Sequence, residues 1–235
     1  MSPSFPADLH IHTALSPCAE REMDPPRIFS RARDAGLKII GLTDHNSTGN
    51  LPAFLSSPPQ DLWVIPGMEV QTREEVHLVC LFPGLEPAMT WGAAVKKSLP
   101  PITNRPEYFG EQTLVNEEGK CMGEEKTLLL NSTAFSLEEV VQQVAGLGGL
   151  VYPAHITRPS FSLLSQLGMI PPCFKRKVLE ITPRDDKKTL QKEYPGYRFI
   201  CSSDAHRLEE IGRGRTVINI KSTCWDELLS ALLFI

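Results

Sequence analysis

Residues 7–20 read ADLHIHTALSPCAE, and the regular spacing of Asp8, His10 and His12 makes this stretch decisive for the fold. Side chains two residues apart on a β-strand point to the same face, so both imidazoles would share one face. Cys18 follows in the same stretch. The pattern fits an ordinary buried strand or one edge of a metal site, and the other four histidines must decide between them.

The composition of the whole chain is that of a globular protein. It has 235 residues, a net charge of −4, 41% hydrophobic and 22% charged residues, which suffices for a sizeable core. We expect no membrane span and no secretory signal, and therefore a cytoplasmic location. The six scattered cysteines form no CxxC pair and are expected to be free thiols. The mild acidity disfavours a broad nucleic-acid-binding surface.

Short apolar runs rich in Val, Ile and Leu alternate with helical patterns along the chain. The runs predict buried strands at 7–12, 38–45, 62–70, 76–82, 148–156, 176–182 and 197–206, with an edge strand at 215–220. Helices are expected at 24–36, where Asp24 is an N-cap, at 136–149, where Ser136 and Glu139 form a capping box, and at 225–235.

This alternation is typical of a parallel α/β architecture. Polar residues stand at the carboxyl ends of most of the runs, which favours a barrel, since a doubly wound sheet concentrates its site at one switch point. Residues 83–135 depart from this alternation of strands and helices and contain a hairpin pattern. We interpret residues 1–235 as a single domain with an insertion at about 83–135 between the fourth and fifth barrel strands, over the strand ends.

The histidines and several carboxylates gather at these predicted strand ends: His10, His12, His45, His77, His155 and His206, with Asp44, Glu69 and Asp204. A lone histidine is usually a satisfied core or surface residue, but all six of this chain lie at strand ends. Imidazoles and carboxylates suit Zn, Mn or Fe, and the number of candidate ligands exceeds the number that one tetrahedral ion binds. Two or three divalent ions are therefore expected, as in sites that hydrolyse phosphoesters.

At this point the sequence resembles a known family. The segments DLHIHTALSP (8–17), GLTDHNS (41–47), GMEV (67–70) with His77, PAH (153–155) and SSDAH (202–206) together resemble the PHP (polymerase and histidinol phosphatase) superfamily, in order over residues 7–215. The resemblance implies a distorted (β/α)7 barrel, with a trinuclear metal site at the carboxyl ends of its strands, that hydrolyses phosphoesters.

The resemblance also implies a distribution of ligands. His10, His12, Glu69 and Asp204 would hold one ion, and Glu69 would bridge to a second ion bound by His77 and His155. His45 and His206 would hold the third.

Two positions near the third ion stay open. Where relatives carry a histidine or carboxylate, this chain has Pro17 and Cys18. Cys18 is either a thiolate ligand that favours zinc or iron, or a residue that packs under the loop. Asp44 either reaches the metals or orients a neighbouring imidazole.

Arg158 is expected to bind the phosphate, with Arg213 or Arg215 as further candidates and Glu180 lining the pocket or serving a structural role. The leaving group would be protonated by metal-bound water, Asp44 or His206.

The predicted function is phosphoester hydrolysis by a metal-activated water, with nucleotides or short nucleic acids favoured as substrates. A histidinol-phosphate-type small-molecule phosphatase and a non-catalytic metal-binding module remain alternatives. The oligomeric state is not predicted.

Overall fold

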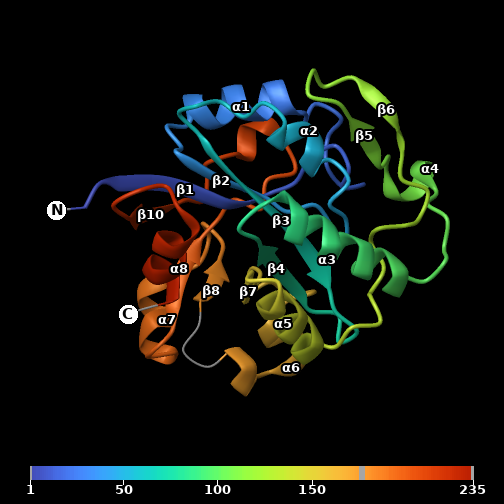
Figure 1. The fold of residues 1–235 in the computed structure, drawn as a ribbon. Helices are drawn as coiled ribbons and strands as arrows, with labels where there is room; N and C mark the ends of the chain where they lie inside the picture. Colours follow the sequence, from blue (N-terminus) through green and yellow to red (C-terminus); the bar gives the residue numbers. More distant parts are fainter. Residues whose placement is uncertain (1, 175–177, 234–235) are drawn as a thin grey trace.

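The computed structural model describes residues 2–174 and 178–233. Its main sheet has the strand order β10-β1-β2-β3-β4-β7 (Figure 1). These strands are β1 (Ser4–Ile11), β2 (Ile39–Leu42), β3 (Trp63–Gln71), β4 (His77–Leu81), β7 (Leu150–Pro153) and β10 (Thr216–Asn219). A second, two-stranded parallel sheet consists of β8 (Val178–Ile181) and β9 (Arg198–Cys201). The predicted strands are all present, although the first residues of 176–182 lie outside the described ranges.

The small sheet lies between the two ends of the large one. The backbone N–H of Ile156 donates to the carbonyl of Glu180 (2.9 Å), which links β7 to β8. The N–H of His12 donates to the carbonyl of Ala205 (2.9 Å), which links β1 to the segment after β9. The result is a curled half-barrel in a mixed α/β fold. Within the described ranges, one isolated bridge (Ile11 with Ala205) at the first strand and a backbone hydrogen bond between β7 and β8 replace a continuous ladder at these two joints.

The expectation of a parallel strand at 76–82 is wrong, and the predicted edge strand at 215–220, for which no direction was predicted, also runs antiparallel to its neighbour. β4 pairs antiparallel with both β3 and β7, and β10 pairs antiparallel with β1. The short connection 72–76 explains the direction of β4, because a parallel crossover needs a dozen or more residues and a hairpin does not. As a consequence, the beginning of β4 lies at the same edge as the end of β3.

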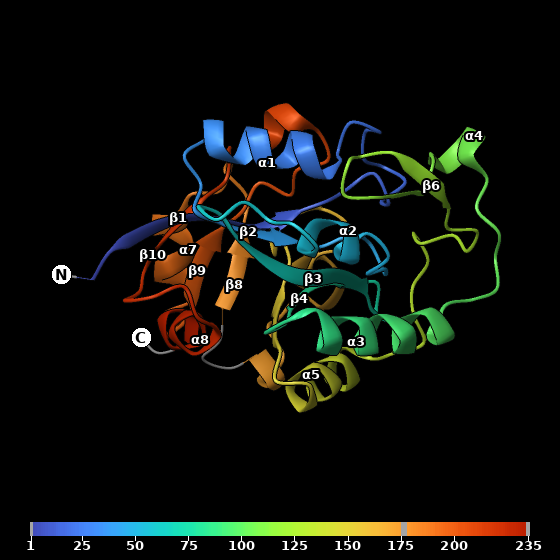
Figure 2. The ribbon, with the colours of Figure 1, turned by 45° about the horizontal axis from the view of Figure 1, so that its top comes forward.

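Helices surround the sheet on its outer side (Figures 1 and 2). They are α1 (Pro25–Asp34), α2 (Leu51–Leu55), α3 (Leu85–Ser98), α5 (Leu137–Gly146), α6 (Leu163–Leu167), α7 (Lys187–Glu193) and α8 (Trp225–Leu233), with 3₁₀ turns at Pro172–Phe174 and Leu208–Glu210. The predicted caps are confirmed: the Asp24 side chain accepts from the N–H of Arg27, and Ser136 and Glu139 form the capping box of α5. Within the described residues, no helix is long and apolar enough to cross a bilayer.

The segment 83–135 has two parts. Helix α3 packs on β3 and contributes Trp91 and Val95 to the main core. The remainder leaves the sheet as α4 (Pro106–Phe109) and the predicted hairpin, β5 (Thr113–Val115) with β6 (Cys121–Glu124). Both views place this part at one side, away from the N-terminus (Figures 1 and 2). Gly110 (φ +94°) leaves no room for a Cβ against the carbonyl of Pro17, so this part packs tightly on the loop after β1.

Candidate metal centre

One edge of the curled sheet carries all of the histidines. His10 lies near the end of β1, and the others follow β1, β2, β7 and β9 or, for His77, begin β4. The antiparallel direction of β4 therefore explains how a residue at the beginning of a strand meets residues that follow other strands. Every one of these imidazoles is buried except that of His206, whose side chain is 20% exposed.

Glu69, in β3, is the centre of this cluster and is 1% exposed. Its oxygens lie within 3.4 Å of ring nitrogens of five histidines: His10, His12, His45, His77 and His155. Burial raises the pKa of Glu69, but the charges of His77, His10 and His45 outweigh that effect and hold it well below its usual range. Glu69 is therefore ionised at neutral pH and offers both oxygens for bridging.

His10, His12 and Asp204 form the tightest part of the cluster. The Nε2 atoms of His10 and His12 lie 3.2 Å apart, and Oδ1 of Asp204 lies 3.3 Å and 3.1 Å from them. Burial and the positive charges of His206 and His45 hold the pKa of His12 well below its usual range, so that His12 is neutral. Convergence of neutral imidazole and carboxylate lone pairs is the donor set of a divalent cation.

Three groups of side chains each have ligand atoms within 4.8 Å of one another: His10, His12, Glu69 and Asp204; His45, Glu69 and His77; and His12, His45 and His206. The first group matches the ligand set implied by the resemblance. The second holds His45 where His155 was expected. Nε2 of His155 still lies 3.1 Å from Oε1 of Glu69, and its buried Nδ1 has no hydrogen-bond partner among the described residues. These residues fit divalent ions that share Glu69.

The backbone is strained where two of these side chains leave their strands. His155 has φ +29° and Asp204 has φ +52°, in the left-handed region that most residues avoid. Such conformations cost on the order of 1–3 kcal/mol each and persist where the surroundings determine them. Here they turn an imidazole and a carboxylate into the cluster directly after β7 and β9.

A hydrogen-bonded chain fixes the orientation of His12. Both oxygens of Asp44 accept hydrogen bonds from the loop after β1: Oδ1 from the N–H of Thr13 and the hydroxyl of Ser16 (2.7 Å each), and Oδ2 from the hydroxyl of Thr13 (2.6 Å). Because Ser16 donates to Asp44, its oxygen accepts from Nδ1 of His12 (2.9 Å). Nε2 of His12 is thereby left as the lone-pair donor to the cluster.

Asp44 itself lies outside the three ligand groups. Of its two expected roles, the geometry favours the orientation of a neighbouring imidazole over direct ligation. Burial raises the pKa of Asp44, and the hydrogen bonds from Thr13 and Ser16 oppose that effect.

Glu180, in β8, supports the cluster in the same way. Its Oε1 lies 2.8 Å from Nδ1 of His10 and accepts from the backbone N–H of His155 (3.1 Å). From the sequence, Glu180 was expected either to line the pocket or to serve a structural role. The structure gives it the second role, behind His10.

Cys18 borders the third group without belonging to it. Although the residue is exposed, its thiol lies beside the imidazoles of His45 and His206. Burial of the thiol raises the pKa of Cys18, but the charges and hydrogen bonds of these imidazoles outweigh that effect and lower it to about 6. A thiolate beside two imidazoles is suitable for zinc or iron.

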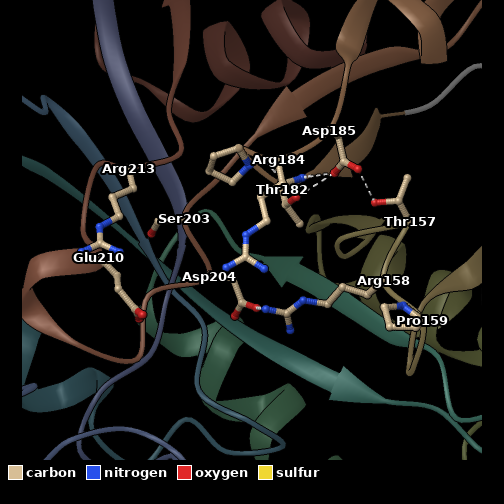
Figure 3. Close-up of a pocket in the computed structure, with 11 residues that line it drawn as sticks. Thr157, Arg158, Pro159, Thr182, Arg184, Asp185, Ser203, Asp204, Glu210 and Arg213 are labelled. Atoms are coloured by element: carbon tan, nitrogen blue, oxygen red, sulfur yellow. Dashed lines mark hydrogen bonds and ion pairs between the residues drawn. The ribbon is translucent and has the colours of Figure 1, made fainter.

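A pocket of about 410 Å³ adjoins the cluster at Asp204 (Figure 3). Nη2 of Arg158 lies 2.6 Å from Oδ2 of Asp204. Arg213 also lines the pocket, whereas Arg215 does not and instead donates to the carbonyl of Ala35 (3.3 Å). The structure thus places Arg158 and one of the later pair beside the candidate metal site.

Sequence reasoning missed two residues near the cluster. Arg184 lines the same pocket, and its only sequence signal is its position shortly after a predicted strand. Phe161 (φ +55°) stacks on His77, with ring centroids 5.0 Å apart and planes 12° apart. No motif contains Phe161, so only the fold reveals this contact.

The fold of this chain is similar to the folds of several known proteins. Residues 194–234 match the family model described as PHP-associated. No curated protein matches the chain in sequence. The lesion-specific endonuclease EndoQ of Pyrococcus furiosus is similar in structure, with a TM-score of 0.77, 21% identity, and coverage of 99% of this chain and 56% of that protein.

Two further structures are similar. Endonuclease Q in complex with a 27-mer duplex that carries an abasic lesion has a TM-score of 0.68 at 21% identity, over 97% of this chain and 56% of that one. A two-domain Bacteroides vulgatus protein that contains a predicted PHP-like metal-dependent phosphoesterase has a TM-score of 0.55 at 15% identity, over 98% of this chain and 63% of that one. The chain thus spans little more than half the length of the Endonuclease Q structures. These matches confirm the resemblance to the PHP superfamily that the sequence motifs predict.

Proposed function

We propose that this chain is a metal-dependent phosphoesterase with nucleotides or short nucleic acids as substrates. The observation that carries the proposal is a buried carboxylate, Glu69, surrounded by imidazoles and next to an arginine-lined pocket that shares Asp204 with the cluster. Cation ligands and anion-binding side chains meet at Asp204, which is the arrangement that phosphoryl transfer requires. The PHP-like phosphoesterase and the endonuclease with the same fold support it.

The three ligand groups would hold two or three divalent ions among Zn, Mn and Fe. Bound ions would activate a water molecule and neutralise charge on the phosphoryl oxygens. The protein's own contribution is orientation: Ser16 and Glu180 fix the rings of His12 and His10. Arg158 contacts Asp204 now and can turn its second guanidinium edge to a phosphoryl oxygen.

The two proton donors expected from the sequence differ in their surroundings. Asp44 is 3% exposed and accepts three hydrogen bonds, so it is not placed to reach a leaving group. His206 has a partly exposed ring. Burial lowers the pKa of His206, but its interaction with the Cys18 thiolate and the charge of Asp204 outweigh that effect and raise it. His206 is thus the better donor wherever it does not serve as a ligand.

The complex of Endonuclease Q with a duplex supports a nucleic-acid substrate. A small-molecule phosphatase of the histidinol phosphate type and a non-catalytic metal-binding module are the alternatives. The test is a phosphate-release and strand-cleavage panel on protein stripped with a chelator and reloaded with zinc, manganese or iron. The panel contains an aryl phosphate, histidinol phosphate, a nucleoside bisphosphate and short oligonucleotides.

We expect metal-dependent turnover that is abolished by the chelator, with nucleotides preferred over histidinol phosphate. The reverse preference would favour the small-molecule phosphatase. Bound metal without turnover on any phosphoester would favour the non-catalytic module and contradict the proposal.

A further inference from the structure

Three arginines from three different loops converge on the pocket beside Asp204. Arg158 follows β7, Arg184 follows β8, and Arg213 follows the 3₁₀ turn after β9. Figure 3 shows the side chains of Arg158 and Arg184 pointing toward Asp204, with Arg213 at the opposite wall beside Glu210. Residues so far apart in sequence meet here only because the half-barrel brings successive strand ends together.

Of the three acidic residues that line the pocket, only Asp204 lies within ion-pair distance of one of these arginines, Arg158, among the described residues. Asp185 accepts from the hydroxyls of Thr157 (2.7 Å) and Thr182 (2.8 Å), and from the N–H of Thr182 (2.7 Å). These hydrogen bonds hold its carboxylate against the two loops. Oε2 of Glu210 accepts from the N–H of His206 (3.0 Å). Asp204 pairs with Arg158.

Two guanidinium groups are therefore open to a ligand. The side chain of Arg184 has no hydrogen bond or ion pair within residues 2–174 and 178–233. In the part of the chain that the structure describes, the Arg213 guanidinium makes one hydrogen bond, from its Nε to the carbonyl of Glu209 (2.9 Å). Their planar forks are the groups that bind phosphate oxygens with two parallel hydrogen bonds.

The pocket and the insertion lie on different flanks of the cluster. The insertion contacts the loop after β1 and the loop after β2, where Nδ2 of Asn50 donates to the carbonyl of Thr113 (3.1 Å). The pocket lies at the loops after β7, β8 and β9. A substrate that extends from the metal ligands into the pocket does not meet the hairpin.

We propose that Arg184 and Arg213 form a subsite for a second phosphate group of the substrate. The reacting phosphate lies on the other side of Asp204, where Arg158 and the metal ligands meet. This inference rests on the proposed function and narrows its substrate class. The preferred substrates carry two phosphate groups, either on one nucleoside or on adjacent nucleotides of a strand.

The test compares one-phosphate and two-phosphate substrates. Metal-loaded wild type, Arg184→Ala, Arg184→Ala/Arg213→Ala and the control Arg215→Ala are assayed with an aryl phosphate, thymidine monophosphate, thymidine bisphosphate and a phosphorylated dinucleotide. Arg184→Ala should raise KM for the two-phosphate substrates by roughly 10- to 100-fold at unchanged kcat, the range of a lost hydrogen bond to a charged group. KM for the aryl phosphate should not change, and Arg184→Lys should restore part of the loss.

Thymidine bisphosphate and the phosphorylated dinucleotide distinguish the two sources of the second phosphate group, which are one nucleoside and an adjacent nucleotide of a strand. A rise in KM for both substrates supports a general subsite for a second phosphate. A rise for the dinucleotide alone shows that the subsite binds the phosphate of an adjacent nucleotide in a strand. Equal effects on one-phosphate and two-phosphate substrates, or no effect, would overturn the subsite while leaving the phosphoesterase intact. If no substrate turns over, the proposed function fails. Calorimetric binding of thymidine bisphosphate then decides the subsite alone: binding weakened by Arg184→Ala but not by Arg215→Ala supports it, and equal binding overturns it.

Discussion

Nδ1 of His10 lies 2.8 Å from Oε1 of Glu180, although 170 residues separate the two in sequence. The same oxygen accepts the backbone N–H of His155. One carboxylate thus orients an imidazole of β1 and anchors the segment after β7. Since Nδ1 of His10 is committed to Glu180, Nε2 is the atom that faces Asp204 and the cluster.

Glu180→Gln should weaken metal binding without unfolding the protein. The amide keeps the size of the side chain but removes the charge that orients His10, and such changes cost about 10- to 100-fold in metal affinity. Competition with a chromogenic chelator measures the affinity, and Glu209→Gln, on the exposed 3₁₀ turn, is the control. Unchanged affinity in Glu180→Gln would refute the orienting role.

Asp44→Asn should destabilise the protein while preserving the number of bound ions. The amide nitrogen would face donors that now point at a carboxylate oxygen, and a buried donor without an acceptor costs about 1–3 kcal/mol. Chemical denaturation measures the free energy of unfolding, and elemental analysis counts the ions. The exposed Asp61→Asn should change the stability little. Loss of one ion in Asp44→Asn would instead show that Asp44 is a ligand.

The parts of the fold that sequence predicted are those with local signals. The strand and helix positions follow from periodicity, and the caps Asp24 and Ser136 mark the starts of α1 and α5. The direction of β4 was missed because an apolar run has no direction, although the short connection before His77 contained the necessary information.

The candidate site likewise divides into residues that local sequence signals predict and residues that they do not. The histidines, Glu69 and Asp204 were found because their spacing matches strand ends and family motifs. Arg184 and Phe161 were missed because their roles depend on which loops meet in space. Asp44 could not be resolved from sequence, since a carboxylate beside a histidine can equally ligate a metal or accept loop hydrogen bonds.

Cys18 is predicted to ligate the third ion as a thiolate. Cobalt-loaded wild type should show a sulfur-to-cobalt charge-transfer band in the near ultraviolet, because the thiol lies beside His45 and His206. The band should be absent in Cys18→Ser and retained in Cys121→Ser, an exposed cysteine of the hairpin. A wild-type spectrum without this band would assign Cys18 to packing alone.

Metal affinity should fall as the pH is lowered. Burial lowers the pKa of His10 and His45, but the charge of Glu180 at His10 and those of Cys18 and Glu69 at His45 outweigh it and raise both. These rings therefore carry protons at neutral pH that an entering ion must displace. Titration calorimetry in two buffers of different ionisation enthalpy should show proton release, with affinity that rises from about pH 6 to about pH 8. A pH-independent affinity without proton release would contradict this assignment.

The most direct test of the metal centre is the double variant His10→Ala/His12→Ala, in which bound metal and aryl phosphate hydrolysis are measured on the same sample. Circular dichroism confirms the fold, and Arg73→Ala, at an exposed position, is the control. We predict that the double variant loses at least one ion and all metal-dependent hydrolysis, while the control keeps both. Full metal-dependent activity in a folded double variant would contradict the account.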